Sequence, residues 1–234
     1  MLQEIRSQFK KNGDPKIAVA AQHFFKEGIK TYGFKAADVT KIAKPYFALI
    51  DKMPKAEVFK LCEELMKSGY QEEFGTACEF CYRKRKQFEK SDFKLFEKWV
   101  KTYVDNWAKC DIFCNHSMNA LIEMYPELIV DIKKWTGSKN RWVKRGAAVT
   151  FILSARRGHF IDDVFEIADD LLTDPDDMIQ KGYGWSLKAA GEHDPQRVYD
   201  FVVTRASQMP RTAFRYAIEK LPEDMRKKAM SIGK

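Results

Sequence analysis

The sequence predicts an all-α protein built from repeated helical pairs, and three observations support this prediction. Apolar residues recur every three to four positions almost throughout the 234 residues, and no segment of strict alternation persists. The chain has 12 Gly and 8 Pro, too few for the frequent tight turns of a β-sandwich. A unit of about 34–36 residues, consisting of a helix, a turn and a second helix, recurs along the chain.

The helical pairs follow one another in order. Each of four first helices is expected to begin near a capping or first-turn residue, at Ser91-Asp92, Tyr125-Pro126, Phe160-Ile161 and Asp194-Pro195. First helices are predicted at 95–104, 128–135, 165–172 and 198–206, and second helices at 107–125, 140–157, 177–193 and 210–221. An earlier pair is predicted at 56–68 and 72–85.

Units that contact mainly their sequence neighbours stack into an α-solenoid. The tetratricopeptide signature is not found in register, which favours HEAT-like repeats. Small residues near the second-helix starts, such as Gly146, Gly184 and Ala213, would let neighbouring helices pack closely. Because no long Gly/Ser/Pro linker interrupts the chain, we expect residues 1–234 to form one domain, a curved superhelix with a basic concave groove.

The cysteines and the N-terminal residues indicate the cellular compartment in which we expect the protein. The five cysteines lie inside helical patterns, where free Cys is a common small apolar residue, so we expect no metal site and a reducing compartment. The N-terminus is charged from its fourth residue and no stretch of about 18 uncharged apolar residues occurs. We therefore expect no secretory signal, no membrane segment and a cytoplasmic location.

The chain is basic, with 41 Lys and Arg against 33 Asp and Glu, a net charge of +8 and a pI near 9.1. Such an excess suggests a polyanionic partner, with nucleic acid the leading candidate. Second helices of a solenoid usually line its concave face, where cations at equivalent points would form a stripe that neutralises phosphates. The predicted stripe comprises Arg141, Lys144, Arg145, Lys181, Lys188, Arg211 and Arg215.

Trp107 and Asp111 stand four residues apart, on one face of a predicted helix. One interpretation is that Trp107 belongs to the core and that Asp111 is an early-helix charge favoured by the helix dipole. Arg145 and Trp185 on adjacent second helices could share a groove with this pair. Two indoles, a carboxylate and a guanidinium suit a site for a cationic or sugar-like group.

Three motifs in this order resemble the AlkD-like DNA alkylation repair glycosylases, a family built from HEAT-like repeats. They are Trp107-Ala-Lys-Cys-Asp111, Trp142-Val-Lys-Arg145-Gly-Ala-Ala and Ile179-Gln-Lys-Gly-Tyr-Gly-Trp185-Ser-Leu-Lys188. The resemblance implies that Asp111 is the catalytic carboxylate, that Trp107 and Trp185 flank the lesion's deoxyribose, and that Arg145 helps hold the site and the DNA backbone. Family members place a tyrosine near the lesion, and the corresponding position here is Phe24, which lacks the hydroxyl.

The implied activity is a monofunctional DNA glycosylase that excises N3- and N7-alkylated purines from duplex DNA without flipping the base. A cationic purine leaves as a neutral base, so one carboxylate that stabilises the oxocarbenium-like sugar suffices, and no cofactor is needed. We expect a monomer, nucleoid-associated when bound to DNA. Two other interpretations remain: a non-catalytic HEAT-like module that recognises DNA structure, and a scaffold whose basic face binds an acidic protein.

Overall fold

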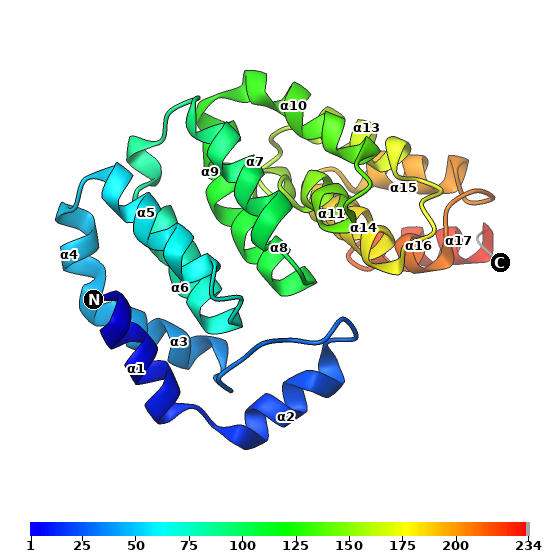
Figure 1. Ribbon diagram of the computed structural model, residues 1–234. Coiled ribbons are helices and arrows are strands. Elements are labelled where there is room, and N and C mark those ends of the chain that lie inside the picture. Colours follow the sequence, from blue (N-terminus) through cyan, green and yellow to red (C-terminus); the bar gives the residue numbers. More distant parts are fainter. Residues whose placement is uncertain (233–234) are drawn as a thin grey trace. The chain divides into compact units, whose positions relative to one another are not determined.

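A computed structural model describes residues 1–232, and every regular element in that range is helical (Figure 1). The all-α prediction is therefore confirmed. The chain divides into two units, Met1–Phe113 and Cys114–Lys234, which are described separately. Within the described range, none of the helices has the length and apolar character needed to cross a membrane.

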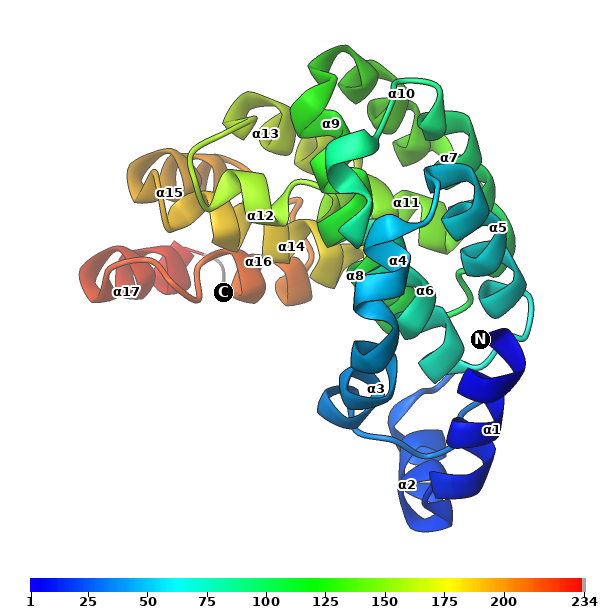
Figure 2. The same ribbon diagram turned by 90° about the vertical axis from the view of Figure 1, so that its left-hand side faces the viewer.

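The first unit is organised around α6. Its α-helices are α1 (Leu2–Asn12), α2 (Pro15–Phe24), α3 (Ala36–Ala43), α4 (Phe47–Lys52), α5 (Lys55–Met66), α6 (Gln71–Arg83), α7 (Asp92–Tyr103) and α8 (Trp107–Phe113), with 3-10 turns at Lys44–Tyr46 and Arg85–Gln87. Helices α3, α4, α5 and α8 all pack on α6, and Figure 2 shows α3 and α4 at one side of it. The predicted pair at 56–68 and 72–85 corresponds to α5 and α6.

An aromatic cluster forms much of the core of this unit. Trp99 and Phe96 are fully buried, their rings stack with centroids 5.6 Å apart, and Phe113 of α8 packs edge-on against both. Phe59 of α5 packs against the same rings. Aromatic pairs of this geometry add to the free energy gained by burying their area. The cluster fixes α8, which carries Trp107 and Asp111, to α5 and α7.

The second unit continues the helical pairs. Its elements are a π-helical turn (Cys114–Met118), α9 (Asn119–Met124), α10 (Ile129–Lys133), α11 (Arg141–Val149), α12 (Ile152–Ala155), α13 (Ile161–Asp170), α14 (Asp177–Gly191), α15 (Pro195–Thr204), α16 (Arg211–Ala217) and α17 (Glu223–Ile232), with 3-10 turns at Pro126–Leu128 and Lys134–Gly137. First helices α10, α13 and α15 lie along one side and second helices α11, α14 and α16 along the other (Figure 1). Two predicted second helices are interrupted, at the π-helical turn and between α11 and α12.

Glycine allows the close approach of second helices that the sequence predicted. A Cβ at Gly184 of α14 would lie 2.7 Å from the Cβ of Tyr216 and 2.9 Å from the carbonyl oxygen of Ala213, both in α16. A Cβ at Gly146 of α11 would lie 3.2 Å from the Trp135 ring. Helices α14 and α16 could not pack at their present distance with a larger residue at Gly184, whereas Gly146 makes room for the 3-10 turn Lys134–Gly137.

Side-chain contacts recur at the predicted repeat length. Lys98 and Glu63 form an ion pair 35 positions apart, as do Arg197 and Asp162. Asn119 donates a hydrogen bond to Ser154, again across 35 positions. Equivalent positions of successive helical pairs are therefore neighbours in space, as expected for stacked repeats.

All five cysteines (Cys62, Cys78, Cys81, Cys110, Cys114) are buried within helical segments, which confirms their interpretation as small apolar residues of such segments. Burial raises the pKa of the Cys62 thiol well above its ordinary value. The Cys62 thiol donates a weak hydrogen bond to the Ala77 carbonyl oxygen, with Sγ and O 3.2 Å apart, and so links α5 to α6.

Candidate functional site

The start of α8 is fixed by an asparagine. Asn106 is 1% exposed; its Oδ1 accepts a hydrogen bond from the Lys109 amide (2.9 Å), and its Nδ2 donates to Gln71 of α6 (3.0 Å). An asparagine that accepts from the amide three residues later is a typical helix N-cap. The cap makes Trp107 the first residue of α8 and places Asp111 one turn later on the same face. Both side chains are half-buried.

Two phenylalanines support the indole of Trp107. Phe25 stacks on it, with centroids 5.2 Å apart and planes at 11°, and Phe24 meets it edge-on at 5.6 Å and 70°. Phe25 is buried, whereas Phe24 is 68% exposed. The structure thus brings Phe24, Trp107 and Asp111 of the predicted site into one region of the first unit.

Helix α2, which ends at Phe24, has none of its ten residues buried. Hydrogen bonds at its two ends hold the helix instead. Asp14 caps the first turn by accepting a hydrogen bond from the Lys16 amide (2.8 Å), and Gln22 exchanges two hydrogen bonds with the backbone of Ile29. The position of Phe24 and Phe25 therefore depends on how the segment after α2 is held.

Glu72 of α6 holds that segment. It is 2% exposed, and one oxygen accepts hydrogen bonds from three consecutive backbone amides, those of Tyr32 (3.1 Å), Gly33 (3.0 Å) and Phe34 (3.2 Å), and from the Thr31 hydroxyl (2.5 Å). Successive amides that converge on one anion form a strong backbone nest. Gly33 has φ +92°, and a Cβ there would lie 2.1 Å from the Asp14 carbonyl oxygen. The sequence did not single out Glu72, because an acidic residue in the first turn of a helix is ordinarily explained by its favourable interaction with the helix dipole.

The neighbouring Glu73 ties α1 to the same segment. Its carboxylate accepts hydrogen bonds from Arg6 of α1 (2.8 Å) and from the Tyr32 hydroxyl (2.7 Å). Burial and the hydrogen bond to Glu73 raise the pKa of Tyr32, so its hydroxyl stays protonated and keeps donating. Tyr32 in turn stacks on Tyr70 at 3.8 Å.

A cavity of about 470 Å³ lies under α2 in this unit. Its wall is mainly apolar and includes Phe24, Phe25, Phe34, Val39 and, from α8, Ile112, the residue that follows Asp111. A cavity of this size with a mainly apolar, partly aromatic wall is typical of a binding site.

In the second unit, Trp185 of α14 is half-buried and Arg145 of α11 is only 5% exposed. The Arg145 guanidinium donates a hydrogen bond to the Met178 carbonyl of α14, and it lies against Gly182, where a Cβ would be 3.5 Å away. Arg145 therefore crosses to the first turn of α14 rather than extending into solvent. Motif spacing alone did not reveal this burial, because it depends on which helix packs alongside.

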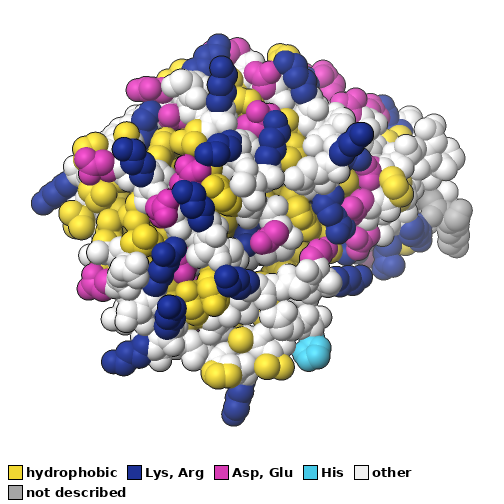
Figure 3. Space-filling view, in the orientation of Figure 1, with side chains coloured by type: hydrophobic (Ala, Val, Ile, Leu, Met, Phe, Trp, Pro, Cys, Tyr) yellow, Lys and Arg dark blue, Asp and Glu magenta, His cyan; other side chains and the backbone are white. Residues whose placement is uncertain are grey.

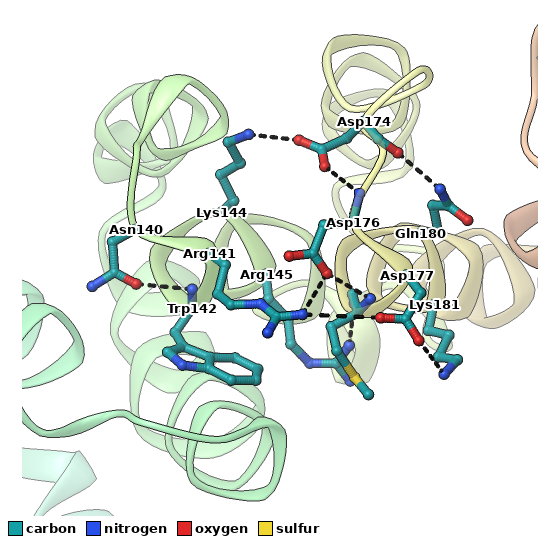
Figure 4. Close-up of polar contacts among 11 residues, drawn as sticks. Asn140, Arg141, Trp142, Lys144, Arg145, Asp174, Asp176, Asp177, Gln180 and Lys181 are labelled. Atoms are coloured by element: carbon teal, nitrogen blue, oxygen red, sulfur yellow. Dashed lines mark hydrogen bonds and ion pairs between the residues drawn. The ribbon is translucent and has the colours of Figure 1, made fainter. Parts of the chain in front are cut away.

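Other cations of the predicted stripe are paired with acids (Figure 4). Arg141 meets Asp176 (2.7 Å), Lys144 meets Asp174 (2.6 Å), and Lys181 meets Asp177 (2.9 Å). Further along, Lys188 of α14 pairs with Glu219 (3.1 Å). Arg211 and Arg215 of α16 are exposed, and Arg215 lines a cavity of about 540 Å³ together with Arg226 and Lys227 of α17.

The positive charge is unevenly divided. The first unit contains 22 Lys and Arg against 16 Asp and Glu and so carries +6 of the net +8. Figure 3 shows Lys and Arg side chains interspersed with Asp and Glu on the face in view. Among the described residues, no group of three or more His, Cys, Asp or Glu side chains could hold a metal ion.

Comparisons with known proteins give one family match and one structural match. Residues 5–221 match the family model described as DNA alkylation repair enzyme. A solved structure of a predicted DNA alkylation repair enzyme from Enterococcus faecalis superposes with a TM-score of 0.80 at 17% identity, over 90% of this chain and 97% of that chain. At that identity the superposition shows the shared fold. No curated protein matches significantly. Because the family model spans nearly all of the sequence, the chain belongs to the DNA alkylation repair enzyme family.

Proposed function

We propose that this protein is a monofunctional DNA glycosylase that releases N3- and N7-alkylated purines from duplex DNA. The observation that carries the proposal is the placement of Asp111 one turn after Trp107 on α8, where Phe24 and Phe25 pack on the Trp107 indole. Membership of the DNA alkylation repair enzyme family supports it.

The chemistry needs few groups. Alkylation at N3 or N7 gives the purine a positive charge, so when the bond between C1′ and the base nitrogen breaks, its electron pair stays with the base, which leaves as a neutral molecule. Positive charge then develops on the sugar, and a carboxylate placed beside it stabilises the transition state. Water adds its oxygen to C1′ and loses one proton, which Asp111 accepts and passes to solvent.

The aromatic residues act on the same charge. An indole face attracts a cation by about 0.5–2 kcal/mol, depending on desolvation. Trp107 is held by its stack with Phe25, which limits the entropy lost when it engages the sugar. In this proposal Trp185 contacts the lesion's deoxyribose, Arg145 supports the site and the DNA backbone, and the base stays in the stack.

The test is release of free base. Duplex DNA that carries N7-methylguanine is incubated with excess enzyme, and free base is measured over time. For a monofunctional glycosylase we expect the DNA strand to be cleaved only after the product is heated. Asp111→Asn is expected to abolish release while retaining DNA binding. Glu97→Gln removes a carboxylate that pairs with Lys101 on α7 and should release base at the wild-type rate. No release by the wild-type protein, or equal release by Asp111→Asn, would contradict the proposal.

The sequence also allowed a non-catalytic module that recognises DNA structure. That function predicts binding to unmodified or branched DNA that survives Asp111→Ala, with no base released. A protein scaffold predicts weak DNA binding with little salt dependence, because phosphate contacts impose a steep one. The same two assays therefore separate all three functions.

A further inference from the structure

The cations that begin α11 and α14 face an acidic segment of the same unit. This acidic segment, Asp174–Asp177, connects α13 to α14 and contains three aspartates in four residues. It ends a longer stretch, residues 161–177, with eight Asp and Glu and no Lys or Arg. Figure 4 shows its carboxylates directed at Arg141, Lys144 and Lys181.

Each of these cations has a carboxylate within 3 Å. The N–O distances are 2.7 Å for Arg141 to Asp176, 2.6 Å for Lys144 to Asp174 and 2.9 Å for Lys181 to Asp177. Arg141 also lies 3.9 Å from Asp177. The positive charge that the sequence places at these helix starts is therefore largely balanced within the unit.

The pairs remain open to exchange. The side chains of Arg141, Lys144 and Lys181 are 37%, 26% and 31% exposed, so a dissolved anion can reach them. Ion pairs with this much exposure stabilise a protein little, and one acidic partner can be replaced by another at small cost. A DNA phosphate offers the same charge as an aspartate and more acceptor oxygens.

We propose that the acidic segment is an internal substitute for DNA phosphates, which occupies Arg141, Lys144 and Lys181 and so limits the affinity for undamaged duplex. The inference rests on the proposed function, because it requires that these cations meet a duplex. Phosphates can bind only by displacing carboxylates, and the remaining negative charge repels the backbone. Fewer counterions are then released on binding than the number of cations would suggest.

Helix capping does not require the negative charge. Asp176 accepts a hydrogen bond from the Met178 amide (2.9 Å) as the N-cap of α14, and Asp174 accepts one from the Asp176 amide (3.0 Å). Asparagine caps helices about as well as aspartate, because a single side-chain oxygen is enough. Substitution of Asp176 and Asp177 by asparagine therefore removes the ion pairs of Arg141 and Lys181, leaves that of Lys144 with Asp174, and keeps the cap.

The test compares the wild-type protein with Asp176→Asn/Asp177→Asn. Binding to an undamaged fluorescent duplex is measured by anisotropy over a range of salt concentrations. We expect the double variant to bind about tenfold more tightly at low salt, and the plot of log affinity against log salt to steepen by up to about 2, since each freed cation adds about 0.9.

The matched control is Asp162→Asn/Asp169→Asn. These two aspartates of α13 pair with Arg197 and Arg205, outside the predicted stripe, and the double variant changes the net charge by the same amount. Its affinity is expected to change by less than about twofold, because only the overall field changes. An equal gain in both double variants would attribute the effect to net charge and overturn the inference.

An affinity and a salt dependence of Asp176→Asn/Asp177→Asn equal to those of the wild-type protein would also overturn the inference. Failure of the proposed function is seen separately, as absence of base release from N7-methylguanine DNA by the wild-type protein. Thermal unfolding of both double variants checks that each is folded at the assay temperature.

Discussion

The indole of Trp107 stacks on the phenyl ring of Phe25, with centroids 5.2 Å apart and planes at 11°. Phe25 follows directly after α2, none of whose own residues is buried. This contact joins the end of α2 to α8, and through α8 to the turn that bears Asp111. The orientation of the proposed sugar-binding surface thus depends on a residue that no motif indicated.

Removal of the stack should slow base release. Phe25→Leu keeps an apolar side chain but loses an aromatic pair of about 0.5–1.5 kcal/mol, so the rate should fall up to about tenfold. Single-turnover release from N7-methylguanine DNA measures it. Phe165→Leu, which disrupts the tilted Phe165–Phe201 pair of the second unit, is the control. An equal loss in the control would show that the effect is not local.

Glu72→Gln should release the segment between α2 and α3. The amide presents a donor where backbone amides need an acceptor, and hydrogen bonds to a charged group contribute about 1.5–3 kcal/mol. We expect faster proteolysis within residues 25–35 and a lower melting temperature. Glu79→Gln, on the same helix and half-buried, should leave both unchanged. Unaltered proteolysis of Glu72→Gln would mean that the segment is held by other contacts.

Gly184→Ala should destabilise the protein by about 1–3 kcal/mol, because the added methyl would overlap α16 and force the two helices apart. Chemical denaturation gives the free energy of unfolding. Gly75→Ala is the matched control: its Cβ would meet only Val39 at 3.8 Å, and alanine favours a helix by up to about 1 kcal/mol. The prediction is wrong if the two variants are equally stable.

Arg145→Ala should lower the melting temperature as well as DNA binding. The substitution empties buried space and leaves the Met178 carbonyl without this donor, which costs about 1–3 kcal/mol. Lys134→Ala alters an exposed cation that pairs with Asp131 one turn earlier, and should change neither property. Differential scanning calorimetry and anisotropy measure the two effects. If Arg145→Ala melts at the same temperature as the wild-type protein, the predicted contribution of Arg145 to stability is wrong.

Stability should fall in acid partly through Glu63. The hydrogen bond from Lys98 lowers the pKa of Glu63 from its ordinary value of 4.5. Because the folded pKa lies below the unfolded one, this carboxylate stabilises the fold above about pH 4.5 and loses that contribution as the pH falls through the folded pKa. Melting temperatures of Glu63→Gln and Lys98→Met should decline less steeply between pH 5 and pH 3 than that of the wild-type protein. Identical slopes would exclude this pair as a contributor.

The sequence was informative where structure is local. Periodicity located the helical pairs, and glycines marked the close approach of α14 to α16. Asn106, which caps α8, lies directly before the motif of Trp107 and Asp111, so the relation of those two residues followed from helix geometry.

What could not be predicted depends on tertiary neighbours. Arg145 and Arg141 lie one helical turn apart with the same side chain, yet one is buried against α14 and the other is paired at the surface. Glu72 looks like an ordinary first-turn acid until the segment 31–34 folds over it. Charge pairing across helices is set by packing, which a periodic pattern does not specify.

The contacts that join positions 35 apart have a consequence for how such a sequence can diverge. A charge in one repeat has its partner in the next, so a reversal at Asp162 is tolerated most readily together with one at Arg197. Loss or duplication of a helical pair would leave unmatched charges on both flanks. Among relatives, compensating charge substitutions should therefore appear at positions one repeat apart in the sequence.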